Sequence, residues 1–241
     1  MKKILFLFGV IISCIFILIS CGNEIEESKA NTNIVAKDEK YVISSNKYER
    51  KDVRISYPVI SGLSDKNKEY RINKIIRDNA LKGLNYYVDD EDIDLKIVYE
   101  VKLNNSRYLS IIYYGVGYFP KDAHPTNHFY TTNIDIENGC IVRLNDIVSV
   151  GKDLATKIKS GEYIPTTNVD ELKNILATMN VDSIYENLLN ADDLDRIGTE
   201  HQSNYFSYIN EDSIGISIEV PHAIGDHVEY ELSDEEIGFK R

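Results

Sequence analysis

The chain has 241 residues, with 27 Lys and Arg against 39 Asp and Glu, which gives a formal net charge of −12. An acidic balance of this size argues against a nucleic-acid partner and would favour a cationic one. The chain contains only 3 cysteines, too few for a disulfide framework, so the fold must be held together by its hydrophobic core.

The first 21 residues have the pattern of an export signal. Lys2 and Lys3 precede an apolar run, which ends in Leu18-Ile19-Ser20-Cys21. This order resembles the lipobox of bacterial lipoproteins, and it predicts a signal peptide over residues 1–20 with lipid attached to Cys21. A simple membrane anchor is the alternative, because the apolar run approaches the ~20 residues of a spanning helix.

We therefore expect an extracytoplasmic protein that is anchored to the bacterial membrane as a lipoprotein. Loss of two lysines with the signal peptide would leave 25 basic and 39 acidic residues, and 25 − 39 gives a mature charge of −14. Residues 21–47 are polar, with scattered apolar positions, and predict a flexible tether. The rest is predicted to form two subdomains, over residues 48–118 and 119–232, and a polar tail over residues 233–241.

The first subdomain is predicted to begin with a strand and a helix. Alternating apolar residues indicate a strand over residues 48–59, placed at a sheet edge because Pro58 cannot donate a hydrogen bond. Ser64 and Asp65 offer N-caps for a helix over residues 66–84, whose apolar positions follow the helical period.

An acidic run, residues 88–94, follows that helix. Converging carboxylates can bind calcium, but this run lacks the central glycine and the terminal glutamate of an EF-hand loop. A solvated acidic loop is the favoured interpretation.

A long hairpin and a shorter one are predicted in the middle of the chain. Strands over residues 97–103 and 108–118 flank the turn at Asn105, and the second is expected to be central because both of its faces carry apolar residues. A strand over residues 127–137 leads into Asn138-Gly139, a pair that favours a type I′ turn.

The helical period returns over residues 152–197. Leu172, Ile175, Leu176 and Met179 form an apolar stripe, with Asn168 and Glu171 as its expected cap. Strands over residues 205–209, 214–220 and 228–232 complete the pattern. This order predicts an α+β fold of antiparallel sheets packed against a long N-terminal helix and a middle helical segment.

Histidines are the main candidates for chemistry. His124 and His128 lie four apart, but Pro125 and strand-like flanks argue against a helical zinc site. His222 and His227 could join them in a cluster with carboxylates, although nothing in the sequence brings the two loops together. We therefore predict no metal, no cofactor and no catalytic residue. The alternative is an envelope hydrolase or metal-dependent enzyme that uses these loop histidines.

Tyrosine is over-represented, with 17 tyrosines and no tryptophan. Several gather around the central loop, where rigid amphipathic rings suit an interface or a glycan platform. Ordinary packing within a sheet is the alternative for these rings. The candidate ligand-binding residues are Tyr113, Tyr118, His124, His128 and Tyr130.

Four segments carry a family resemblance. Ala123-His124-Pro125, the strand over residues 129–135, Asn138-Gly139 and Leu144-Asn145-Asp146-Ile147 resemble a domain family found in the anti-sigma factor RsiV and the peptidoglycan deacetylase PdaC. Pro221, Gly225 and Val228 are similar to the closing motif of that family, in shortened form. The resemblance extends over residues 51–232.

The resemblance implies an α+β domain that binds its ligand without catalysis. In RsiV the corresponding domain binds lysozyme, so a cationic protein such as lysozyme, or peptidoglycan fragments, are the expected partners besides the membrane. The chain shows no cytosolic segment for a sigma factor and no deacetylase domain, and those roles are not carried over.

Overall fold

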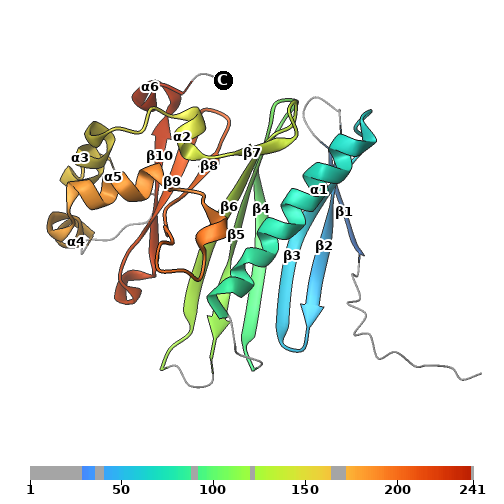
Figure 1. Ribbon diagram of the computed structural model, residues 1–241, viewed down its shortest axis with the longest axis horizontal. Coiled ribbons are helices and arrows are strands. Elements are labelled where there is room, and N and C mark those ends of the chain that lie inside the picture. The colour runs from blue at the N-terminus through green and yellow to red at the C-terminus, as the bar shows by residue number, and fades with distance from the viewer. Residues whose placement is uncertain (1–28, 36–40, 88–91, 120–122, 164–171, 240–241) are drawn as a thin grey trace, which may run out of the picture.

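The computed structural model describes residues 29–35, 41–87, 92–119, 123–163 and 172–239. These residues form a seven-stranded sheet, in the order β1-β2-β3-β4-β5-β6-β7, and a three-stranded sheet, in the order β10-β9-β8 (Figure 1). Helices lie between and beside the strands, so the fold is α+β, as the sequence predicts. The predicted signal peptide and Cys21 lie outside the described residues.

The domain begins earlier in the chain than predicted. β1 (Lys29–Val35) pairs with β2 (Val42–Arg50), which pairs with β3 (Val53–Ser61). Tyr41 is buried as well. The tether predicted over residues 21–47 therefore extends too far, because short polar residues between the apolar positions of β2 hide its alternation.

Residues 48–59 form parts of two strands and not one. The chain reverses at Lys51, whose φ is 52°. β3 pairs with β4 in parallel over Val53–Ile55 alone, so Pro58 lies where β3 has β2 as its one neighbouring strand. A missing N–H donor is tolerated at such a position.

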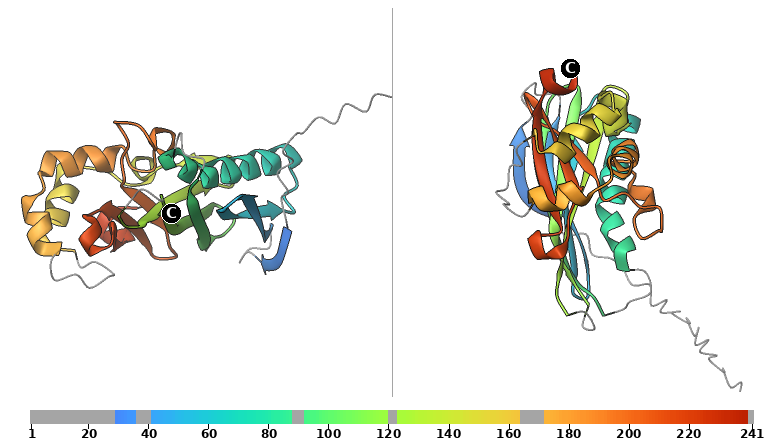
Figure 2. Two further views of the ribbon diagram at one scale, coloured as in Figure 1. Left: turned by 90° about the horizontal axis from the view of Figure 1, so that it is seen from below. Right: turned by 90° about the vertical axis from the view of Figure 1, so that its left-hand side faces the viewer.

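The helix α1 (Lys66–Ala80) packs along one face of the seven-stranded sheet (Figure 2). The Asp65 carboxylate caps it by accepting hydrogen bonds from the backbone N–H groups of Asn67, at 2.9 Å, and Lys68, at 3.0 Å. The prediction of a long N-terminal helix is not supported in that form, since α1 has 15 residues and follows three strands.

The chain then tightens into η1 (Leu81–Tyr87), a 3₁₀ segment. The hydroxyl of Tyr130 donates to the Ala80 carbonyl at 2.6 Å, and a Cβ on Gly83 would lie only 2.9 Å from that hydroxyl oxygen. This close approach explains why the helix ends at Ala80 and not at Leu84.

The central strands are β4 (Asp94–Asn104), β5 (Tyr108–Tyr118), β6 (Thr126–Asp135) and β7 (Cys140–Val142). The β4–β5 hairpin and the central position of β5 agree with prediction. The β6–β7 hairpin exists too, but Asp135 pairs with Cys140 across a four-residue loop, in which Gly139 alone has a positive φ, 64°. The type I′ turn is therefore wrong, because the Asp135 carboxylate holds the loop by accepting from the Asn138 backbone at 2.8 Å.

The remaining elements form the second half of the fold. They are α2 (Leu144–Ile147), α3 (Lys152–Ser160), α4 (Leu172–Thr178), α5 (Val181–Leu189), η2 (Leu194–Arg196), β8 (Phe206–Ile209), β9 (Ser213–Glu219), η3 (His222–Ile224), β10 (His227–Ser233) and α6 (Asp234–Ile237). The expected cap of α4, Asn168 and Glu171, lies outside the described residues.

The predicted polar tail over residues 233–241 is wrong for its described part. Ser233 and Glu236 form a capping box at the start of α6, and Ile237 and Phe239 are buried. The Phe239 ring lies 6.1 Å from that of Tyr108, measured between centroids. Two apolar residues among charged ones therefore dock this segment on the domain.

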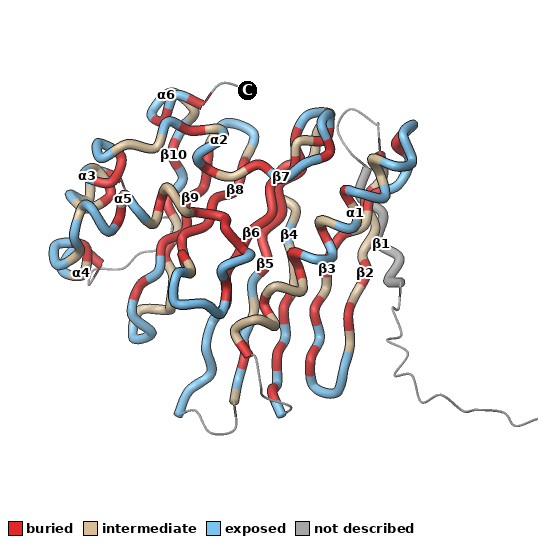
Figure 3. The backbone as a smooth tube through the Cα atoms, in the orientation of Figure 1, coloured by how far each residue is buried: buried red, intermediate tan, exposed pale blue. Residues whose placement is uncertain are grey.

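Two cores meet at β8. Phe206 and Tyr208 belong to the core beneath the seven-stranded sheet and α1, whereas Tyr205 and Ile209 belong to the core of the three-stranded sheet and the later helices. Figure 3 shows β8 and the neighbouring part of β6 buried. The predicted subdomain boundary at residues 118/119 lies between β5 and β6, which pair directly in one sheet.

Among the described helices, none has the length and apolar character that crossing a membrane requires.

Candidate functional site

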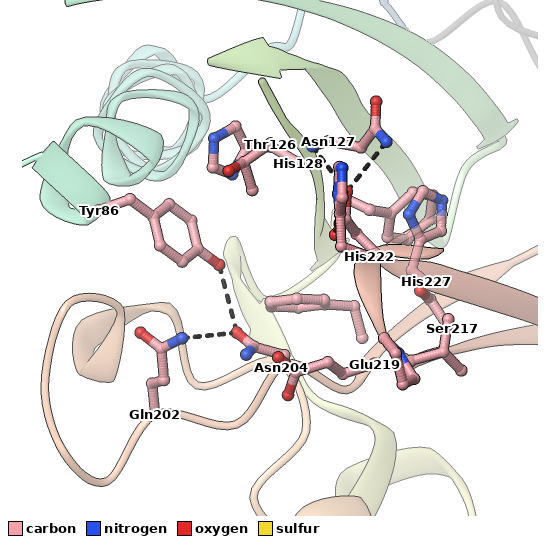
Figure 4. Close-up of a pocket in the computed structure, with 15 residues that line it drawn as sticks. Tyr86, Thr126, Asn127, His128, Gln202, Asn204, Ser217, Glu219, His222 and His227 are labelled. Atoms are coloured by element: carbon pink, nitrogen blue, oxygen red, sulfur yellow. Dashed lines mark hydrogen bonds and ion pairs between the residues drawn. The ribbon is translucent and has the colours of Figure 1, made fainter. Parts of the chain in front are cut away.

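A cavity of about 350 Å³ lies beside a free edge of β6. β7 pairs with β6 only over Asn133–Asp135, so within the described residues the part of β6 near Thr126 has no paired strand on this side. The β9–β10 hairpin and the segment before β8 form the opposite wall, and Tyr86 of η1 contributes from the side (Figure 4).

Asp226 closes one end of the cavity. Its Oδ2 accepts hydrogen bonds from the backbone N–H and the side-chain amide of Asn127, both at 2.9 Å. Its Oδ1 lies 3.0 Å from Nδ1 of His222. The left-handed conformations of Gly225, with φ 110°, and Asp226, with φ 71°, turn the hairpin loop toward β6. One carboxylate thus ties the hairpin to the sheet edge.

The two histidine loops meet at the mouth of the cavity. The rings of His124 and His222 are stacked, with 5.7 Å between their centroids. His222 is exposed, as is His124. The sequence left open whether these loops approach one another, and the structure brings them together around Asp226.

His128 lies in the wall and is buried, with 6% of its surface exposed. Its Nε2 and the Tyr87 hydroxyl form a hydrogen bond, and its ring lies 4.8 Å from the ring of Tyr86. Burial lowers the pKa of His128 to about 4, and the nearby Asp226 carboxylate opposes this shift only in part. His128 is therefore a neutral ring at pH 7.

The opposite wall contains polar atoms that lack a partner. His227 pairs with Glu219 across the β9–β10 ladder, so both side chains lie on one face of the hairpin. Within the described part of the chain, Nδ1 of His227 and Oγ of Ser217 are buried without a hydrogen-bond partner. The His227 ring packs on Phe129 at 4.7 Å between centroids.

Amides, a hydroxyl and a second carboxylate also line the cavity. Oδ1 of Asn204 accepts from the Tyr86 hydroxyl at 3.4 Å and from Nε2 of Gln202 at 2.8 Å. Burial, together with the Glu219 carboxylate, raises the pKa of Tyr86, which stays protonated. The described lining contains no Lys or Arg. The cavity therefore suits a neutral or cationic polar ligand better than an anion.

The geometry does not form a metal centre among the described residues. They contain no group of three or more His, Cys, Asp or Glu side chains that could hold a metal ion. His124 and His222 stack face to face, and Nδ1 of His222 is engaged with Asp226.

Two of the predicted ligand-binding residues are not accessible. Tyr113 and Tyr130 are fully buried and stack on each other at 5.1 Å between centroids. Their hydroxyls donate to the carbonyls of Ile76, at 3.4 Å, and Ala80, at 2.6 Å. Both rings therefore face α1, as cross-strand partners on one face of the sheet.

Tyr118 is 39% exposed and lies outside the cavity lining. It shares one face of β5 with Tyr114 and Val116, which are 41% and 43% exposed. His124 and His128 are the predicted residues that lie at the cavity, one at its mouth and one in its wall.

Sequence reasoning missed most of the lining. Tyr86, Gln202, Asn204 and Glu219 belong to three separate segments, and none of them lies in a recognisable motif. The one available sign was Gly225-Asp226 between two histidines, because glycine followed by aspartate favours a tight turn that can present the carboxylate.

The fold and the cavity together define an α+β domain with a polar pocket between a sheet edge and a hairpin. No family model matches the sequence, and no curated protein matches it. Among solved structures it is similar to a DUF3298 family member from Bacteroides fragilis, with 14% identity, a TM-score of 0.47, and coverage of 88% of this chain and 91% of that one.

A second similar structure is a DUF3298 family protein from Pseudomonas aeruginosa. The identity is 10% and the TM-score 0.43, and the alignment covers 88% of this chain and 92% of that one. At such identities a function must be argued from the residues of this chain.

Proposed function

We propose that this protein is an extracytoplasmic, lipid-anchored binding protein, whose domain holds a polar cell-wall ligand in the cavity beside β6 without catalysing a reaction. One observation carries the proposal: amide, carboxylate and imidazole groups from distant segments converge on a cavity of about 350 Å³. Ligand pockets of roughly 300–1,000 Å³ with a few convergent polar groups are typical binding sites.

Anchoring is a separate part of the proposal. The export pattern that ends in Cys21 supports a lipoprotein on the outer side of a bacterial membrane. The resemblance to the domain family of RsiV and PdaC agrees with a place in the envelope. Mass spectrometry of the protein purified from membranes would test it, since the expected N-terminal residue is a diacylglyceryl-modified Cys21.

The state of the imidazoles favours binding over catalysis. His128 is neutral and engaged with Tyr87, and burial holds its pKa far below the value that suits a general base at neutral pH. Asp226 bonds to Asn127, so its charge is used to hold the hairpin.

An envelope hydrolase is the second candidate, and one observation favours it. Nδ1 of His222 lies 3.0 Å from Oδ1 of Asp226, and a carboxylate in this position orients a histidine that acts as a base. The exposed His222 ring at the cavity mouth would then face the substrate.

Lysozyme is the other ligand that the family resemblance implies. The acidic chain, at −12 overall, would attract a cationic protein and speed its association. A cavity of this size and polarity fits a small polar group better than a protein surface, so we assign cell-wall material to the cavity itself.

The test uses the full-length protein in detergent. We expect it to sediment with insoluble peptidoglycan, and we expect Asp226→Ala, which frees the hairpin from β6, to reduce the bound fraction at least fivefold. Asp195→Ala is the matched control, because Asp195 is 77% exposed and lies outside the cavity lining.

Three further outcomes decide between the candidates. Absence of binding to both peptidoglycan and lysozyme would remove the proposed function. Binding to lysozyme alone would move the ligand from the cavity to the protein surface. Soluble sugar fragments that accumulate with time, and that disappear with His222→Gln, would establish the hydrolase instead.

A further inference from the structure

Five side chains of the cavity lining are planar groups with two polar atoms side by side. Asn127, Gln202 and Asn204 supply amides, and Glu219 and Asp226 supply carboxylates. A sugar hydroxyl both donates and accepts, and neighbouring hydroxyls on a ring present alternating donors and acceptors. Planar side chains match this pattern, because an amide offers a donor nitrogen beside an acceptor oxygen and a carboxylate offers two acceptor oxygens.

Asn204 is held in a defined orientation. Its Oδ1 accepts from both the Tyr86 hydroxyl and Nε2 of Gln202, at 3.4 and 2.8 Å. Because the oxygen is used in this way, the Nδ2 group of Asn204 is left as the donor for a ligand. The natural partner of an N–H donor is a carbonyl oxygen, such as that of an acetamido group.

Charge separates a sugar from an ionic ligand. The described lining contains no Lys or Arg and two carboxylates, which argues against phosphate or carboxylate ligands. Asp226 already accepts from Asn127 and faces His222. Glu219 is then the exposed carboxylate of the described lining that is left to accept a hydrogen bond from a ligand hydroxyl.

Apolar surface is interleaved with the polar groups. Tyr86, Phe129, Phe206, Val220 and Pro221 all line the cavity. One face of a hexose ring presents C–H groups, and rigid amphipathic rings that offer an apolar body beside a polar tip suit such a face. The methyl of an acetamido group also needs apolar contact.

Two polar atoms in the hairpin wall are buried behind the cavity surface. Oγ of Ser217 and Nδ1 of His227 have no partner among the described residues. A buried polar group without a hydrogen bond costs roughly 1–3 kcal/mol. Both atoms are closed off from the cavity surface, so this cost belongs to the hairpin and is not relieved by an occupant while the wall keeps this arrangement.

From these observations we infer that the cavity is a subsite for a neutral N-acetylated hexosamine unit of a polysaccharide. The inference rests on the proposed function, since it names the part of the cell-wall ligand that the cavity recognises. The sugar strand is bound, and any peptide attached to it lies outside the cavity.

The experiment is isothermal titration calorimetry, in which tetra-N-acetylchitotetraose is added to the full-length protein in detergent and the heat of binding is measured. We expect saturable binding. We also expect the same oligosaccharide to release the protein from insoluble peptidoglycan in the sedimentation assay. The fully deacetylated, cationic tetramer should bind at least tenfold more weakly, because it lacks the acetamido carbonyl and methyl.

Two variants locate the binding. Asn204→Ala and Glu219→Gln should each weaken the affinity for the oligosaccharide at least fivefold. Asn174→Ala on α4 and Glu235→Gln on α6 are the matched controls, since both side chains are exposed and lie outside the lining, and they should remain within twofold. Glu219 is exposed, so its substitution leaves folding intact even if Asn204→Ala does not.

The outcomes distinguish this inference from the function on which it rests. Peptidoglycan binding without binding or displacement by the oligosaccharide overturns the sugar subsite and leaves the proposed function standing. Tighter binding of the deacetylated tetramer also overturns it, in favour of a cationic ligand. Equal affinities of wild type and both cavity variants would place the sugar elsewhere. If the protein binds neither insoluble peptidoglycan nor the oligosaccharide, both proposals are wrong.

Discussion

Asp192 is a buried carboxylate that joins three elements. It accepts hydrogen bonds from the backbone N–H and the hydroxyl of Ser207, both at 2.6 Å, from the Thr131 hydroxyl at 3.0 Å and from the Leu144 backbone at 2.9 Å. These partners lie on β8, β6 and α2. Since buried charges are tolerated when they are fully hydrogen-bonded, Asp192 fixes how the two halves of the fold meet.

We expect Asp192→Asn to destabilise the protein by about 3 kcal/mol, because an amide cannot accept at both positions and leaves buried donors unpaired. Asparagine tolerates the left-handed φ of 64° at this position, so the loss measures hydrogen bonding and not backbone strain. Urea unfolding of both proteins checks the value. Asp195→Asn on the surface should change stability by under about 1 kcal/mol. A loss that small at Asp192 would contradict its role.

His128 makes stability depend on pH. Its pKa is about 4 in the folded state against 6.5 for a free histidine, so the unfolded chain binds the extra proton. This contribution is complete above pH 6.5 and is lost as pH falls toward 4. Between pH 7.5 and pH 5 we expect it to lower the free energy of unfolding by about 2 kcal/mol.

The measurement compares urea unfolding of the wild type and of His128→Asn at the two pH values. Because other groups titrate equally in both proteins, the variant should lose about 2 kcal/mol less than the wild type over this interval. His201→Asn, at an exposed position, should follow the wild type. Parallel losses in all three proteins would show that His128 is not held neutral.

At the scale of elements, α6 shows that a segment rich in charged residues can still pack against a core. Five of the nine residues 233–241 are charged, yet Ile237 and Phe239 are buried in the second core. We expect Phe239→Ala to cost about 3 kcal/mol, as for other buried aromatic side chains. Thermal unfolding followed by circular dichroism tests it. Glu235→Ala, on the exposed side of α6, should leave the midpoint nearly unchanged, and equal effects of the two substitutions would refute the docking.

Local patterns predicted the strands and helices better than their junctions. The apolar patterns and turn residues located β4, β5, β6, β8, β9 and β10, and the Asp65 cap located the start of α1. The turn at Lys51 was missed because Tyr48 was joined to the alternating residues that begin at Val53, although four charged residues, 49–52, separate them. The β6–β7 turn was misassigned because the Asp135 side chain, and not the Asn138-Gly139 pair alone, determines the loop.

The site was harder to predict than the fold. The sequence indicated His124 and His128, but it could not show that Asp226 bonds to Asn127, 99 positions away. It also ranked Tyr113 and Tyr130 as contacts, although their hydroxyls both donate to carbonyls of α1. Residue type predicts what a side chain can do, whereas its neighbours across the sheet decide whether a ligand can reach it.

At the scale of the whole molecule, the two cores are coupled through β8 and should unfold together. We expect calorimetry to show one transition whose van't Hoff and calorimetric enthalpies agree. Ile76→Ala in the first core and Leu188→Ala in the second should both lower that single midpoint, since each buried truncation costs roughly 2–5 kcal/mol. Two separate transitions, each sensitive to one variant, would show independent halves.

The contact between Asn127 and Asp226 has a consequence for the order in which the molecule is made. Each strand of the seven-stranded sheet pairs with the next one along the chain, so this sheet is able to form as the polypeptide emerges. The hairpin that completes the cavity follows 99 positions after Asn127, roughly 5–20 s later at usual rates of synthesis. A nascent or shortened chain would hold half of the pocket, and recognition would begin only when the last strands are in place.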